Sequence, residues 1–141
     1  MTTRVLIVDD EPGMSRTLAI ALGEEYEVVT AQGGAEALRR LEAGERFGVI
    51  LCDLMMPGVS GMDVHGALAQ WAPDQAARMV FMTGGAYTEQ AADFLDGGHP
   101  TLRKPFFIDE LRLTLRQQVE RRTPPVGGPR RPNSSPPPTC G

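Results

Sequence analysis

Cysteines are scarce in this sequence, which limits how the chain can be stabilised. Only two of the 141 residues are Cys, and they lie in different surroundings. Cys52 belongs to an apolar run that predicts a buried strand, whereas Cys140 belongs to a polar C-terminal segment, so we do not expect a disulfide. A chain without disulfides suits a reducing compartment, and we therefore expect a cytoplasmic protein.

Long hydrophobic runs are missing as well. No stretch of the sequence approaches the roughly 18 consecutive apolar residues that identify a membrane-spanning helix. Only two threonines separate Met1 from the first predicted strand, which leaves no room for a signal peptide. We expect no membrane association, and the start immediately before a strand favours a free-standing protein.

The sequence also lacks a basic surface. Residues 1–122 contain all 18 Asp and Glu residues of the chain but only 12 of its 14 Lys and Arg residues, a net charge of −6. Proteins that bind nucleic acid need clustered positive charge to meet the phosphates, so we expect no direct nucleic-acid binding by this segment. The chain as a whole is 41% apolar, which is ample for one hydrophobic core.

What the sequence does contain is an alternation of two patterns. Short apolar runs typical of buried strands cover residues 4–8, 26–31, 49–53, 79–82 and 101–104. Apolar residues recur at helical spacing in five further segments, at about 12–23, 35–44, 62–71, 88–95 and 108–119. This alternation predicts an α/β protein with a flavodoxin-like doubly wound (βα)5 fold. Its five-stranded parallel sheet, with strand order 2-1-3-4-5, would form the middle layer of a three-layer sandwich.

The composition changes at residue 123. Of the last 19 residues, seven are Pro, three are Gly and none is acidic. Such a segment cannot bury a core, so we predict one folded domain over residues 1–122 and a disordered Pro-rich tail over 123–141. An inert linker is the favoured interpretation of this tail, and a Pro-rich ligand for an aromatic groove is the alternative.

Polar side chains follow four of the five predicted strands. Asp9 and Asp10 come after the first, Asp53 ends the third, Thr83 follows the fourth and Lys104 closes the fifth. Because the carboxyl ends of parallel strands meet at one edge of the sheet, we expect these side chains to lie close together. Each has a simple structural explanation when taken singly, as a helix cap, a turn residue or a solvated lysine. Their combination at one edge favours a functional site.

The acidic residues at this edge suit a magnesium site. Mg²⁺ prefers one or two carboxylates with several waters, so we expect Asp10 and Asp53 to bind it directly and Asp9 to act through water. A main-chain carbonyl near Met55 would complete the ligand set. Without a metal the crowded acids repel one another, so at least one of them should have a raised pKa in the folded protein.

The remaining polar groups suit phosphoryl transfer to a carboxylate. Asp53 can act as an oxygen nucleophile and become an acyl phosphate. Lys104 supplies a compact positive charge for the phosphoryl oxygens, and Thr83 supplies a hydroxyl donor. Positioning and charge neutralisation are most of the catalysis that such a transfer needs.

Four motifs together resemble the receiver domain of two-component response regulators. They are VLIVDDEP at residues 5–12, DLMMPGVSG at 53–61, Met82-Thr83-Gly84, and Lys104-Pro105-Phe106. The resemblance covers about residues 4–120. It implies a phosphorelay protein in which Asp53, with Mg²⁺, accepts a phosphoryl group from a phosphohistidine on a histidine kinase or a histidine phosphotransfer protein. It also implies that Thr83 and Lys104 sense the phosphoryl group and that the Lys104–Pro105 peptide is cis.

The same resemblance implies how the protein would signal. A receiver acts through protein–protein contacts as a monomer or weak dimer. It is not an enzyme beyond self-phosphorylation and slow self-dephosphorylation. One position departs from the usual pattern, because the residue three before the lysine is commonly Tyr or Phe and here is Thr101. Thr101 is too small to fill a ring-sized space, and Tyr87 and His99 lie near enough in sequence to replace the ring.

Two alternative functions remain open. The stretch from Thr83 to Phe106 looks most like receivers of hybrid sensor histidine kinases, so the chain could be such a module and pass its phosphate to a phosphotransfer protein. A less favoured alternative is an aspartate-nucleophile phosphatase similar to haloacid dehalogenases. Those enzymes carry two aspartates separated by one residue after the first strand, whereas Asp9 and Asp10 are adjacent.

Overall fold

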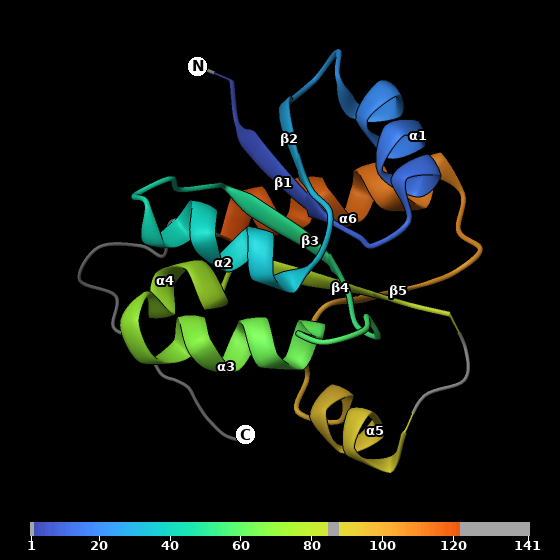
Figure 1. Cartoon of the computed structure of the whole chain (residues 1–141). Helices are drawn as coiled ribbons and strands as arrows, with labels where there is room; N and C mark the ends of the chain where they lie inside the picture. Colours follow the sequence, from blue (N-terminus) through green and yellow to red (C-terminus); the bar gives the residue numbers. More distant parts are fainter. Residues whose placement is uncertain (1, 85–87, 122–141) are drawn as a thin grey trace.

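A parallel five-stranded sheet forms the centre of the molecule (Figure 1), whose computed structural model describes residues 2–84 and 88–121. The strand order is β2-β1-β3-β4-β5, and all neighbouring strands are parallel. The strands are β1 (Arg4–Val8), β2 (Glu27–Ala31), β3 (Val49–Asp53), β4 (Met79–Thr83) and β5 (Thr101–Arg103). The predicted flavodoxin-like α/β fold and strand order are confirmed. The predicted tail over 123–141 and the residue Tyr87 lie outside the described residues.

Helices cover both faces of the sheet in the described part of the chain. They are α1 (Pro12–Leu22), α2 (Gly34–Glu42), α3 (Gly61–Trp71), α4 (Pro73–Ala76), α5 (Glu89–Leu95) and α6 (Ile108–Arg121). Helices α1 and α6 pack on one face, and α2, α3 and α4 pack on the other (Figure 1). Within residues 2–84 and 88–121, none of these helices has the length and apolar character needed to cross a membrane.

The short helix α4 corrects the sequence prediction, which ended the helical segment at Ala72-Pro73 and expected five helices. Pro73 instead begins a second helix directly after α3. Proline suits this first position because its missing N–H has no intrahelical partner there and its φ is already helical.

The central strands are buried on both faces, which explains why their sequences are continuous apolar runs. All five residues of β3 and of β4 are buried. Alternate residues face opposite cores, so that Ile50 and Cys52 pack with α2 and α3 while Val49 and Leu51 pack with α1 and α6. Cys52 is a buried free thiol.

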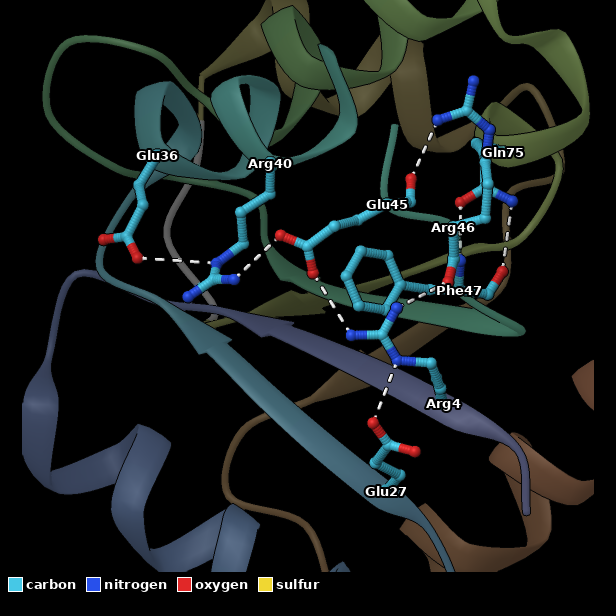
Figure 2. A network of polar contacts seen from close by, with 8 residues as sticks. All are labelled: Arg4, Glu27, Glu36, Arg40, Glu45, Arg46, Phe47 and Gln75. Atoms are coloured by element: carbon cyan, nitrogen blue, oxygen red, sulfur yellow. Dashed lines mark hydrogen bonds and ion pairs between the residues drawn. The ribbon is translucent and has the colours of Figure 1, made fainter. Parts of the chain in front are cut away.

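A charged network lies at the amino-terminal edge of the sheet (Figure 2). Arg4 at the start of β1 pairs with Glu27 and with Glu45, each at 3.2 Å, and Arg40 on α2 pairs with Glu45 at 3.0 Å and with Glu36 at 3.7 Å. Each side chain is partly exposed, so the individual pairs contribute little to stability. Together they connect β1, β2 and α2 to the segment that leads into β3.

Gln75 on α4 holds the backbone of that segment from the other side (Figure 2). Its Oε1 accepts a hydrogen bond from the Phe47 N–H at 3.0 Å, and its Nε2 donates to the Phe47 carbonyl at 3.1 Å. Gln75 is 3% exposed and Phe47 is also 3% exposed, so this amide satisfies two buried backbone groups at once. The helix that the sequence analysis missed therefore fixes the entry into β3.

We predict that Gln75→Leu destabilises the protein by about 2 kcal/mol or more, because it leaves a buried N–H and a buried C=O unpaired. Chemical denaturation measures the change in the free energy of unfolding. Gln70→Leu, at an exposed position near the end of α3, is the matched control and should change stability by about 0.5 kcal/mol or less. Equal effects of the two substitutions would show that the Gln75 amide does not hold the strand.

Candidate functional site

Three carboxylates meet at the carboxyl edge of the sheet. Asp9 follows β1, Asp53 ends β3, and these two strands are hydrogen-bonded neighbours. One oxygen each of Asp9, Asp10 and Asp53 lies within 4.8 Å of the others. Asp9 is fully buried, Asp53 is 8% exposed, and Asp10 is exposed. The structure thus brings together the three acids that the strand-end argument singled out.

Lys104 reaches the same point from the end of β5. Its Nζ lies 3.4 Å from Asp9 Oδ2 and 3.6 Å from Asp53 Oδ1, and no other lysine is present in the sequence. The Lys104 N–H donates to the Thr83 carbonyl at 2.7 Å, which ties the lysine to the end of β4. The Lys104–Pro105 peptide is cis, as predicted.

Asp9 has both of its oxygens engaged within the protein. Oδ1 accepts a hydrogen bond from the Glu11 N–H at 2.9 Å, and Oδ2 accepts one from Lys104 Nζ. Asp9 is thus already held by two protein groups, whereas Asp10 is open to solvent. The donor set therefore suits a hard cation that Asp10 and Asp53 bind directly and Asp9 binds through a water molecule.

Burial and like charge dominate the electrostatics of Asp53. Burial raises its pKa, the nearby Lys104 lowers it, and Asp9 and Asp10 raise it again, so that the pKa moves from 3.8 to about 6. One ammonium group does not offset desolvation together with two neighbouring carboxylates. The prediction that at least one of the acids has a raised pKa is confirmed.

Cys52 lies directly before Asp53 but does not add a charged group to the site. Its Sγ donates to the Asp53 carbonyl at 3.3 Å. Burial, followed by the negative charges of Asp53 and Asp9, raises the pKa of the thiol far above its ordinary value. Cys52 therefore remains a neutral thiol and belongs to the core.

The loop after Asp53 is fixed at both of its ends, a feature that the sequence analysis missed. The Leu54 N–H donates to the Met82 carbonyl and the Gly61 N–H donates to the Leu54 carbonyl, both at 2.9 Å. Only glycine fits at position 61, because a Cβ there would lie 2.7 Å from the Asp53 carbonyl oxygen. Helix α3 can therefore begin directly against the end of β3.

A capping box completes the same anchor. Ser60 Oγ accepts from the Asp63 N–H at 3.1 Å, and Asp63 Oδ2 accepts from the Ser60 N–H at 3.0 Å. The sequence carries a signal for this arrangement, a serine followed three residues later by an acidic residue before an apolar stretch.

The remaining predicted residues lie around this centre. Thr83 is the last residue of β4, is 2% exposed and lies opposite Arg103 of β5. Met55 lies in the loop after Asp53 and is 38% exposed. Thr101 is exposed, and its hydroxyl donates to the His99 carbonyl at 2.9 Å.

Comparison with known proteins gives a consistent result. The family described as response regulator receiver domain matches residues 5–116. Transcriptional regulatory protein KdpE of Mycobacterium tuberculosis is 38% identical over 122 residues, which is 86% of this chain and 53% of the relative. Transcriptional regulatory protein TcrA of the same organism is 37% identical over 125 residues, covering 86% of this chain and 47% of the relative. The chain therefore spans about half the length of these relatives.

Solved structures share the same fold. A CheY-like response regulator receiver domain protein from Methanospirillum hungatei superposes with a TM-score of 0.76 at 25% identity, covering 86% of this chain and 97% of that one. A response regulator receiver domain protein from Clostridium thermocellum has a TM-score of 0.74 at 27% identity, covering 84% of this chain and 95% of that one.

The raised pKa of Asp53 predicts how Asp53→Asn changes stability in the absence of metal. The folded protein binds this proton more readily than the unfolded chain, so stability falls as pH rises from 3.8 to about 6, and above that range the full penalty is present. At pH 7.5 with a chelator, Asp53→Asn should therefore be more stable than the parent by up to about 3 kcal/mol, because the pKa is raised from 3.8 to about 6. The difference should vanish near pH 4.

Chemical denaturation at several pH values measures this difference. Asp93→Asn, which removes an exposed carboxylate from α5, serves as the control and should leave stability nearly unchanged. A metal-free Asp53→Asn protein that is no more stable than the parent at pH 7.5 would show that Lys104 already compensates the acids.

Proposed function

The chain belongs to the response regulator receiver domain family, and from this we propose that Asp53 accepts a phosphoryl group from a phosphohistidine on a histidine kinase or a histidine phosphotransfer protein. The observation that carries the proposal is the placement of the Asp53 carboxylate, 3.6 Å from Lys104 Nζ and beside Asp9 and Asp10, at the carboxyl edge of a parallel sheet.

In the proposed transfer, an ionised oxygen of Asp53 attacks the phosphorus atom of the donor. A new O–P bond forms, the N–P bond of the phosphohistidine breaks, and the imidazole leaves with the electron pair. With its pKa at about 6, Asp53 is mostly ionised at neutral pH and can act as this nucleophile. Lys104 Nζ, already within 3.6 Å of the carboxylate, would pair with a phosphoryl oxygen.

We further propose that the acids hold Mg²⁺, with Asp10 and Asp53 as direct ligands and Asp9 acting through water. The main-chain carbonyl of Met55, in the loop fixed between β3 and α3, would complete the protein ligands. The metal would supply positive charge that neutralises both the crowded carboxylates and the phosphoryl oxygens. Thr83, at the end of β4 beside Lys104, would donate its hydroxyl to another phosphoryl oxygen.

Protein contacts are the output that this domain supports best. The two relatives are named transcriptional regulatory proteins, and about half of their length lies outside the match. Residues 1–122 carry a net charge of −6, which disfavours direct contact with DNA phosphates. We therefore propose that the domain signals to another protein surface. The alternative as a hybrid-kinase module, the cytoplasmic location and the monomeric or weakly dimeric state stay predictions.

We predict that incubation with acetyl phosphate and Mg²⁺ adds one phosphoryl group to the chain. Asp53→Asn should abolish the modification, because an amide oxygen cannot form the acyl phosphate. Mass spectrometry of the intact protein measures the addition, and Asp93→Asn should be modified as the parent is. Modification that persists in Asp53→Asn would assign the acceptor to another residue.

We predict that Mg²⁺ stabilises the parent more than Asp10→Asn. A ligand that binds only the folded state at 100 times its Kd adds about 2.7 kcal/mol, which raises Tm by several degrees in a domain of this size. Thermal unfolding with Mg²⁺ and with a chelator measures the effect. Glu11→Gln, which removes the neighbouring exposed carboxylate, should retain the full rise. Equal rises in the parent and Asp10→Asn would remove Asp10 from the ligand set.

A further inference from the structure

The only two histidines of the chain lie in one cluster of four rings. His65 comes from α3, Phe81 from β4, Phe94 from α5, and His99 from the turn between α5 and β5. The ring centroids of His65 and His99 are 4.8 Å apart, and those of Phe94 and His99 are 4.1 Å apart in a stacked arrangement. Phe81 contacts Phe94 edge-on at 5.0 Å. We call these four residues the ring cluster.

The ring cluster is a main attachment of helix α5, which lies at the periphery of the fold (Figure 1). Ala91 is the one fully buried residue of this helix, and Phe94 and Leu95 are partly buried. Phe94 therefore provides much of the apolar contact of α5, and two of its three ring partners are imidazoles. A helix of seven residues has little stability of its own and depends on such packing.

The surroundings of both imidazoles favour the neutral form. Burial lowers the pKa of His65, and the charge of His99 lowers it further, while burial lowers the pKa of His99. Cation–π attraction to the phenyl rings favours the protonated form, but burial outweighs it and lowers the pKa of both imidazoles. The charged side chains on the elements packed against the cluster are all exposed to solvent; they are Asp63 on α3, Glu89, Asp93 and Asp96 on and directly after α5, and Arg103 on β5.

We propose that His65 and His99 form a proton-operated latch, which holds helix α5 against β4 and α3 when both imidazoles are neutral and releases it when they are protonated. Two imidazolium rings with centroids 4.8 Å apart repel each other, and because both residues are partly buried each ring has lost part of its hydration. Opening α5 separates the two rings and exposes them fully to solvent, so the open form binds protons more readily than the closed form.

The sign of the pH dependence follows from this difference. An imidazole whose pKa is lowered in the closed form supports the latch above about pH 6.5, the ordinary value for His. That support is lost as pH falls from this value through the lowered pKa. The latch thus opens on mild acidification. The proposal goes beyond phosphoryl acceptance, because it concerns the packing of α5 and needs neither a donor nor a metal.

The first test is a pH titration of the imidazole C–H resonances by NMR, in which the chain gives two histidine signals. Both should titrate below about 6.5 in the parent. In His99→Phe, which keeps a ring and removes the proton, the pKa of His65 should rise because its charged neighbour is gone. Titration of both at the ordinary value, or no change of His65 in His99→Phe, would overturn the latch.

The second test follows α5 itself through amide hydrogen-exchange protection factors between pH 7.5 and 5. For each unit by which an imidazole pKa is lowered, protonation should reduce protection in α5 about tenfold, relative to amides of α6. The His65→Phe/His99→Phe double variant retains four rings, and its α5 protection should be independent of pH. The Asp53 titration is common to both proteins and cancels in the comparison. Equal pH dependence of α5 in the parent and the double variant would refute the proposal.

Discussion

The position of the Lys104 ammonium between Asp9 and Asp53 is the interaction on which the site depends. It lies 3.4 Å from one carboxylate and 3.6 Å from the other, and it is the one lysine in the sequence. Burial, together with the charges of Asp9 and Asp10, raises the pKa of Asp53 although this ammonium group lowers it. The protein therefore tolerates the three acids at this position, and the site still favours added positive charge. This is the property that the proposed magnesium-dependent phosphoacceptor needs.

The parallel sheet brings these side chains together through the pairing of its strands. Because β1, β3 and β4 are neighbours in register, their last residues emerge side by side. Backbone contacts then hold Asp53 and the loop that follows it, with the Leu54 N–H bonded to the Met82 carbonyl and Gly61 packed against the Asp53 carbonyl. The Asp53 side chain is 11% exposed, so its carboxylate still reaches solvent although the backbone around it is held in place. A side chain at position 61 would displace the loop after Asp53, because its Cβ would meet the Asp53 carbonyl oxygen and Leu54 Cα.

Strand order and the juxtaposition of the acids were predictable because each depends on a pattern local in sequence. Continuous apolar runs indicate strands buried on both faces, and the residue after each run falls at a known edge. Helix α4 was not predictable in this way, because four residues give no periodicity and Ala72-Pro73 is typical of a helix end. The Gln75 contact with Phe47 and the pairing of His65 with His99 join residues 28 and 34 positions apart, and no local pattern indicates such partners.

Asp53 and the histidine pair respond to acid with opposite signs, although both are neighbours of β4: Asp53 pairs with Met82, and both imidazoles contact Phe81. Protonation of Asp53, with its pKa raised to about 6, relieves repulsion among the acids and stabilises the metal-free fold as pH falls. Protonation of His65 and His99, whose pKa values are lowered, destabilises the packing of α5 over an overlapping interval. A measurement of global unfolding reports the sum of these two contributions to stability, so neither can be obtained from it alone.

Because Phe81 and Thr83 are two residues apart on one strand, they face the same side of the sheet. Loss of the ring contacts at Phe81 would therefore loosen the packing on the face of β4 that also carries Thr83. Acid would thus stabilise the structure around Asp53 and destabilise the packing of α5. Only measurements that resolve single residues can separate these two effects.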